Sequence, residues 1–301
     1  MIIEFVIIEF VIIEFVIIEF VIIIDDKNQF VMIPNDKTNL NMIGVGNMSY
    51  KIIEELSMNN WQSLSTLFYD GWVLRLAKGY TIYANSINPL YFSTYNLDDK
   101  INDCEKIYTN NGLTPTFKIT PFVQPENLDK IIEQKGYSLV DFDGTSFVSV
   151  QTMNLVGTIE PTLHSVNITK NLNSEWLDYF CRFNNVEEEH KPTIVQMLST
   201  IATKKCFLSL YHQDKVVACG LGVIEREYIG LYDIVTDSQY RNQGFGKQLV
   251  MNLLKWGKAN GAKYSYLTVL SNNDPALKLY TNIGFSEVYQ YWYRVKKSFI
   301  N

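Results

Sequence analysis

A glycine-rich turn with two basic side chains stands towards the end of the chain. It reads Arg241-x-x-Gly244-x-Gly246, and Lys247 follows at once. Glycine has no Cβ atom to keep a phosphate away from the backbone. Where such a turn opens a helix, unpaired backbone N–H groups point outward and the helix dipole favours negative charge. The residues of this turn are therefore those of an anion site, suited to a phosphate group.

The segments on either side of the turn have the periodicities of a strand and a helix. Residues 229–235 form a largely apolar, strand-like run that contains one carboxylate, Asp233. Behind the turn, apolar side chains recur at helical spacing, namely Leu249, Val250, Leu253, Leu254 and Trp256. A strand, the turn and a helix are thus predicted in that order.

A second block, residues 273–285, has the pattern N-x-x-A-x-x-L-Y-x-x-x-G-F. Asn273 is a favoured helix N-cap residue, and Gly284 is placed to end the helix in a left-handed conformation. A strand over residues 287–295 follows. The block therefore predicts a short capped helix that carries Tyr280 near its end.

The two motifs together resemble those of the GCN5-related N-acetyltransferase (GNAT) superfamily, and the resemblance spans residues 166–297. It implies an α/β fold, with a mixed sheet flanked by helices, and an acyltransferase that uses acetyl-CoA and no metal ion. In the superfamily, acetyl-CoA lies where two parallel strands splay apart, here residues 228–236 and 263–270. The cofactor-binding residues that the resemblance implies are Ile234, Val235 and Thr236 on the first strand, Arg241, Asn242, Gln243, Gly244, Phe245, Gly246 and Lys247 at the pyrophosphate, and Asn273.

The reaction that the resemblance implies is direct attack of a neutral amine on the thioester within a ternary complex. The backbone N–H of Val235 is expected to hold the oxyanion. Tyr280 is the expected catalytic residue, because a phenol pKa of about 10 keeps it protonated at neutral pH and able to protonate the leaving thiolate. A buried tyrosine that only packs against the sheet is the alternative. For the general base, Asp233, the segment 187–190 and an ordered water all stay open.

The net charge and the cysteine pattern of the chain limit the kinds of ligand and partner that it can have. A net charge of −6 argues against a general nucleic-acid-binding protein and favours a cationic acceptor. We expect a small-molecule or peptide amine, bound between residues 289–293 and the first half of the chain. A catalytically silent CoA-binding or interaction module is the alternative function. The cysteines lack metal-ligand spacing, which is typical of a reduced, cytoplasmic protein without a metal site; they are Cys104, Cys181, Cys206 and Cys219.

An internal repeat links the two halves of the chain. Residues 104–113 match residues 276–285, with Lys, Tyr, Thr, Asn and Gly identical. No G-x-G turn precedes Tyr108, so the first copy lacks the phosphate cradle. Chance recurrence of a common helix C-cap is the alternative. Residues 71–86, which have the pattern of two strands joined at a Lys-Gly turn, also resemble the first domain of bacterial two-domain acetyltransferases.

Three regions are predicted along the chain. Residues 1–47 form a low-complexity leader outside the fold, residues 48–156 a degenerate GNAT-like domain, and residues 157–301 a complete one, with a linker at 157–161. The two domains form a tandem in which only the second has both motifs.

The leader contains four perfect copies of Ile-Ile-Glu-Phe-Val, residues 2–21, followed by three isoleucines. A period of five matches neither a helix nor a strand, so no clean apolar face results. The nineteen Ile, Phe and Val residues would favour membrane insertion by about 6–11 kcal/mol. The four glutamates oppose it by about 2.5–3.5 kcal/mol each, which nearly cancels that gain. We therefore expect no membrane attachment through residues 1–24.

Overall fold

The structure, a computed structural model, describes residues 20–24, 30–34, 44–157, 159–163 and 165–296. The chain divides into two compact units, Met1–Tyr50 and Lys51–Asn301. In the first unit β1 (Phe20–Ile24) pairs antiparallel with β2 (Phe30–Pro34), and α1 (Gly44–Asn60) begins. Residues 2–19 of the pentapeptide repeat lie outside the described residues.

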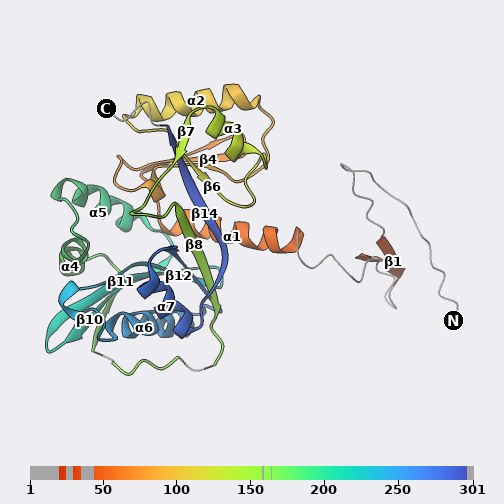
Figure 1. Ribbon diagram of the computed structural model, residues 1–301. Coiled ribbons are helices and arrows are strands. Elements are labelled where there is room, and N and C mark those ends of the chain that lie inside the picture. The colour runs from red at the N-terminus through yellow and green to blue at the C-terminus, as the bar shows by residue number, and fades with distance from the viewer. Residues whose placement is uncertain (1–19, 25–29, 35–43, 158, 164, 297–301) are drawn as a thin grey trace, which may run out of the picture. The chain divides into compact units, whose positions relative to one another are not determined.

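The second unit is built on one mixed sheet of twelve strands (Figure 1). Two of the described strand pairs, β5–β6 and β12–β13, are parallel, and the others are antiparallel. The order across the sheet is β3 (Ser65–Tyr69), β4 (Trp72–Leu76), β5 (Ile87–Pro89), β6 (Thr116–Ile119), β14 (Ser286–Lys296), β8 (Phe147–Asn154), β13 (Tyr264–Leu270), β12 (Tyr228–Thr236), β11 (Lys215–Glu225), β10 (Lys204–His212) and β9 (Val166–Thr169), while β7 (Tyr137–Leu139) also pairs with β14. With helices on this sheet, the predicted α/β fold class is confirmed.

In the second half of the chain, helices cover both faces of the sheet. α6 (Phe245–Ala259) and α7 (Asp274–Ile283) share one core, in which the predicted apolar stripe of α6 is buried. α4 (Ser174–Asn184) and α5 (Lys191–Thr200) pack against the opposite face in a separate core. In the first half, α2 (Leu97–Asn110) and α3 (Leu128–Gln134) cover β4, β5 and β6.

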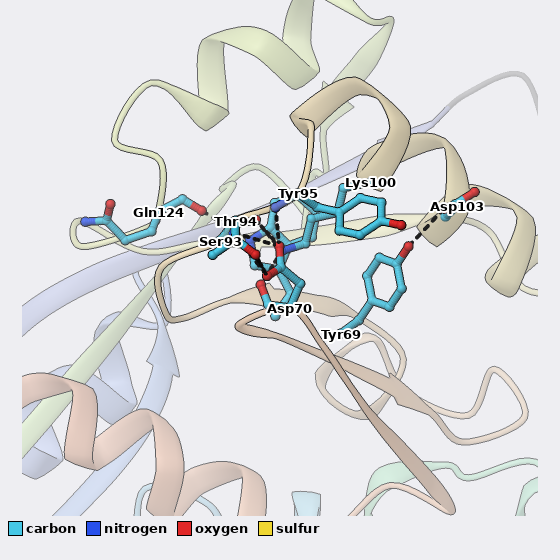
Figure 2. A network of polar contacts seen from close by, with 9 residues as sticks. Tyr69, Asp70, Ser93, Thr94, Tyr95, Lys100, Asp103 and Gln124 are labelled. Atoms are coloured by element: carbon cyan, nitrogen blue, oxygen red, sulfur yellow. Dashed lines mark hydrogen bonds and ion pairs between the residues drawn. The ribbon is translucent and has the colours of Figure 1, made fainter.

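A buried polar network fixes the turn between β3 and β4 to the start of α2 (Figure 2). The ammonium group of Lys100, fully buried, donates to Ser93 Oγ at 2.6 Å and to Asp70 Oδ2 at 3.1 Å, and stands over the Trp72 ring. Donors from Ser93 and from the backbone of residues 94 and 95 hold the pKa of Asp70 well below its usual range. The Lys100 ammonium group and the Asp70 carboxylate each have several partners within the first half, so the network serves the fold of that half.

The two halves of the chain exchange strands. β14 comes from the second half, yet its end lies between two strands of the first, because Arg294 is opposite Phe117 of β6 and Leu139 of β7. Reciprocally, β8 comes from the first half and lies between β13 and β14. In Figure 1, β8 (green) and β14 (blue) run side by side through the middle of the unit. One sheet thus passes through both predicted domains, and the division at residue 156 stays a prediction.

One local expectation is wrong. Residues 71–86 do not form two strands joined at Lys78 and Gly79, because β4 is followed by a 3₁₀ turn and then by β5. The side chain of Asn85 accepts the backbone N–H groups of Ala77 (2.6 Å) and Gly79 (3.2 Å). These bonds fold the segment into a compact loop, which leaves it no sheet partner.

Candidate active site

The parallel strands β12 and β13 pair over three residues only and then part. The last pair is Gly230 with Tyr266. The hydroxyls of Tyr232 and Tyr266 lie 2.5 Å apart beside this point, and Asn60 donates to Tyr266 at 3.1 Å. A Cβ at Gly230 would stand 2.7 Å from both tyrosine rings. Two tyrosine side chains that meet edge to face and one glycine therefore lie at the point where the expected splay begins.

A cavity of about 720 Å³ opens where the strands part. Its wall in the second half includes residues 231–234 of β12, residues 267–270 of β13, and three residues at α7, Asn273, Ala276 and Tyr280. The first half closes it with residues on α1, β4, β6 and the loop at 80–83. The splayed strands, the predicted tyrosine and the first half thus meet at one chamber.

Tyr280 lies in the wall of this cavity with 7% of its surface exposed. Its ring meets the edge of Phe285 at 5.8 Å between centroids. Burial raises the pKa of its phenol to about 12, so the hydroxyl is protonated at neutral pH. Within the described residues that hydroxyl makes no hydrogen bond. Asn273 caps α7, because its side chain accepts the N–H of Ala276 at 3.3 Å.

The glycine-rich turn precedes α6 as predicted, but glycine is needed at its two positions for different reasons. Gly244 is the N-cap with a left-handed backbone (φ 85°), and a Cβ there would meet nothing within 4 Å. A Cβ at Gly246 would stand 3.2 Å from Thr236 Oγ1 and 3.3 Å from Leu279. Gly244 therefore faces open space, whereas Gly246 lets the helix approach β12 and α7.

The first turn of α6 carries no side-chain cap. Its first backbone bond runs from the N–H of Gln248 to the carbonyl of Gly244, at 3.1 Å. The N–H groups of residues 245–247 precede that bond, which is the arrangement of an anion site. Arg241 is exposed beside it, with its Nε 3.4 Å from the carbonyl of Thr236. Of the expected cofactor-binding residues, Ile234 and Asn273 line the cavity, while Val235, Thr236 and residues 241–247 lie beyond its wall.

The backbone of β12 indicates which amides face the opening. The N–H of Asp237 donates to Val217 of β11 at 2.9 Å. Antiparallel bonds alternate along a strand, and Val235 is opposite Cys219, so the Val235 N–H is also directed at β11. The N–H groups of Ile234 and Thr236 are then directed at the side that β13 has left. This geometry favours Ile234 over Val235 as the oxyanion donor.

A β-bulge in β12 sits at the cavity. Asp233 and Ile234 together face the single residue Gly220 of β11, and Asp233 has a left-handed backbone (φ 53°). Its Oδ2 atom is buried and has no hydrogen-bond partner among the described residues. Burial raises the pKa of this carboxyl group to about 8. An aspartate inside an apolar strand run was the sequence signal for this residue.

Aromatic side chains from both halves form the far wall. Tyr232 stacks on Trp61 at 6.1 Å, and Tyr293 meets the rings of Tyr83 at 6.0 Å and Tyr291 at 5.6 Å. The sequence indicated the contribution of residues 289–293 but not which residues of the first half take part. Pairing between segments so distant leaves no local periodicity to read.

The buried cations of the wall are already engaged. Arg75 donates to the carbonyls of Tyr83 (2.6 Å), Met58 (3.4 Å) and Trp61. Lys118 pairs with Glu54 at 2.5 Å and stands 3.8 Å from the centre of the Tyr291 ring. The segment 187–190 borders the cavity through Glu187 and His190, and His190 packs on Tyr80 at 5.4 Å.

Comparison with known proteins agrees with this geometry. The family model described as "Probable histone acetyltransferase Rv0428c C-terminal" matches residues 50–294. An uncharacterized N-acetyltransferase, YobR, of Bacillus subtilis is 26% identical over 247 residues, which cover 81% of this chain and 98% of that protein. A [ribosomal protein bS18]-alanine N-acetyltransferase of Haemophilus ducreyi is 26% identical over 92 residues, 31% of this chain and 63% of that protein.

Solved structures share the fold. A GCN5-related N-acetyltransferase from Kribbella flavida superposes with a TM-score of 0.60 at 11% identity, covering 85% of this chain and 96% of that one. A tandem GNAT protein from the clavulanic acid biosynthesis pathway gives a TM-score of 0.53 at 9% identity, covering 70% and 74%. Among the described helices, none has the length and apolar character to cross a membrane. The chain belongs to the family of that Rv0428c C-terminal model, within the GNAT superfamily, and is an acyltransferase of the N-acetyltransferase type.

Proposed function

We propose that the chain transfers the acetyl group of acetyl-CoA to a primary amine of a small molecule or peptide, by direct attack in a ternary complex. The observation that carries the proposal is the position of Tyr280, which lines the cavity at the splay of β12 and β13 and whose hydroxyl is protonated at neutral pH. A single chamber can then hold both reactants, which converts the encounter into a reaction between oriented neighbours.

The residues present fit acetyl-CoA. Beyond Gly230 the edge of β12 has no partner from β13, so an extended pantetheine arm would pair with the backbone at Ile234 and Thr236. The pyrophosphate would take the N–H groups of residues 245–247, with Arg241 and Lys247 adding positive charge. Asn273 lies in the cavity wall, as does Tyr280.

The chain's own residues would then carry the chemistry. The amine nitrogen attacks the thioester carbon, and the oxyanion is held by the N–H of Ile234. The C–S bond breaks, and the Tyr280 hydroxyl gives its proton to the thiolate. Its raised pKa keeps the Tyr280 hydroxyl in the protonated form at neutral pH, and that is the form a proton donor needs.

One relative and the matching family model suggest which amines to try first. The relative is named for an alanine of ribosomal protein bS18, and the family model is described as a probable histone acetyltransferase. The panel therefore contains an alanine-initiated peptide, an N-terminally blocked peptide with one lysine, and a polyamine. Thiol release above the rate without amine supports the proposal. Thermal shift with acetyl-CoA is measured alongside, since ligand at a hundred times its Kd adds about 2.7 kcal/mol of stability.

The outcomes separate the alternatives. A thermal shift without thiol release from any amine would indicate a catalytically silent CoA-binding module. Absence of both would contradict the cofactor site and the transfer reaction together.

A further inference from the structure

Asp233 is an ionisable side chain of the cavity wall to which the reaction above gives no task. Its Oδ2 is buried and unpartnered within the described part of the chain. A buried polar atom without a hydrogen bond is costly, and native structures rarely keep one without a reason. A ligand that brings a hydrogen-bond donor to this oxygen would remove the cost.

The bulge explains why this carboxylate reaches the cavity. In a regular strand, successive side chains alternate between the two faces. Ile234 packs into the α6 core and Val235 into the opposite core, with which Tyr232 also packs. Asp233 acts electrostatically on Cys181 and Cys219, which belong to that same opposite core. The left-handed residue in the bulge therefore puts two consecutive side chains, Tyr232 and Asp233, on one face.

The surroundings of Asp233 make it the unbalanced charge of the cavity. Arg75 gives its donors to three backbone carbonyls, and Lys118 is paired with Glu54. The pKa of Tyr80 is raised, mainly by burial and in addition by the nearby charge of Asp233. Glu187, the other carboxylate of the wall, is exposed to water. A cationic group entering the cavity would thus meet one desolvated carboxylate and several aromatic faces, both of which attract cations.

We propose that Asp233 is the catalytic base of the transfer: its carboxylate binds the ammonium form of the acceptor amine and takes the first proton from it. The inference rests on the proposed function. Asp233 adjoins Ile234, the expected oxyanion donor, so the nitrogen freed at Asp233 is beside the carbon it attacks. Its pKa, raised to about 8, is close to the working pH, where proton transfer by a side chain is most effective.

The protons balance as follows. The ammonium group gives one proton to Asp233, and its nitrogen forms the C–N bond while the C–S bond breaks. Tyr280 protonates the thiolate. The second proton of the nitrogen passes through water to the Tyr280 phenolate, and Asp233 returns its proton to solvent. The products are an amide, CoA thiol and one proton.

The test compares Asp233→Asn with the unchanged chain across pH, using the most active amine of the panel. Asp233→Asn should keep the thermal shift with acetyl-CoA. Its kcat/KM should fall by about 10²–10⁴ near pH 7. The deficit should shrink towards unity above the pKa of the amine, about 8 for a peptide α-amine and about 10 for a lysine side chain, since a neutral amine needs no base. Asp214→Asn, on the exposed β10–β11 turn, is the matched control and should follow the unchanged chain.

Three results would overturn the inference. One is a pH profile of Asp233→Asn that coincides with that of the unchanged chain. Another is a deficit that stays constant up to high pH, which indicates a structural role. The third is an Asp233→Glu variant that has the same deficit and the same pH profile as Asp233→Asn although it keeps a carboxylate. If the unchanged chain acetylates no amine, both the proposed function and this inference fail. If the unchanged chain is active and Asp233→Asn is equally active, only the assignment of Asp233 as the base fails.

Discussion

Tyr108 and Tyr280 occupy the same place in two copies of one helix and turn, but the surroundings of their hydroxyl groups differ. In each copy the tyrosine carbonyl accepts, at 3.0 Å, the N–H of the residue that follows a left-handed glycine, Gly112 or Gly284. The Tyr108 hydroxyl donates to the carbonyl of Arg75 at 2.8 Å and accepts its N–H at 3.2 Å. Tyr280 instead lines the cavity. The first copy uses its tyrosine to fix a strand, and the second keeps it available for a ligand.

Tyr280→Phe should separate binding from turnover. The ring and its packing on Phe285 remain, so acetyl-CoA should still raise the melting temperature. If the hydroxyl is the general acid, kcat should fall by about 10²–10⁴. Thiol release and thermal shift on the same sample measure the two effects.

Tyr108→Phe is the matched control for that variant. Turnover should be unchanged, while the free energy of unfolding falls by about 1–3 kcal/mol because two buried backbone groups of Arg75 lose a partner. Full activity of Tyr280→Phe, or loss of activity in a folded Tyr108→Phe variant, would show that Tyr280 is not the catalytic tyrosine.

Gly244→Asp should remove acetyl-CoA binding, and Gly244→Asn should not. Both side chains enter open space, and both put a Cβ on a left-handed residue at a cost of about 1–2 kcal/mol. Only the aspartate sets a negative charge against the pyrophosphate at the start of α6. Isothermal titration with acetyl-CoA measures the affinity of both variants. Equal affinities would show that the turn does not bind the pyrophosphate. Gly246→Asp is a poorer test, since its Cβ already crowds Thr236 and Leu279.

The free energy of unfolding should fall as the pH rises from about 4 to about 8, the range in which Asp233 loses its proton. Its pKa is raised from 3.8 to about 8 by burial, so the folded state holds this proton more firmly than the unfolded state. The stabilisation is complete below pH 4 and is lost as pH rises towards 8. Urea midpoints measured across this range should therefore fall more steeply for the unchanged chain than for Asp233→Asn. Parallel curves would show that burial does not perturb this carboxyl group.

A chain that begins at Met48 should melt at the same temperature as the full chain. The second unit, Lys51–Asn301, contains the whole twelve-stranded sheet. Both forms should also distribute alike between membrane and supernatant fractions of a cell lysate. Membrane recovery of the full chain alone would show that the leader is an attachment segment.

The sequence predicts best what short-range patterns determine. β12, α6, α7 and β14 follow from two motifs. It misses β5 because the Asn85 side chain, and no periodicity, organises the loop before it. The cavity wall from the first half is missed for a related reason. Arg75, Tyr83 and Lys118 meet the second half only through strand pairing across distant positions, which leaves no local trace.

The exchanged strands impose an order on the making of the molecule. β6 and β7 leave the ribosome early, but β14, the strand that lies between them, is synthesised after every other strand of the sheet. The first half therefore keeps two unpaired strand edges until β14 has been synthesised. Early stop codons or cleavage before Ser286 would damage the part of the protein that was made first, and chaperones that shield exposed strand edges should act on the nascent chain.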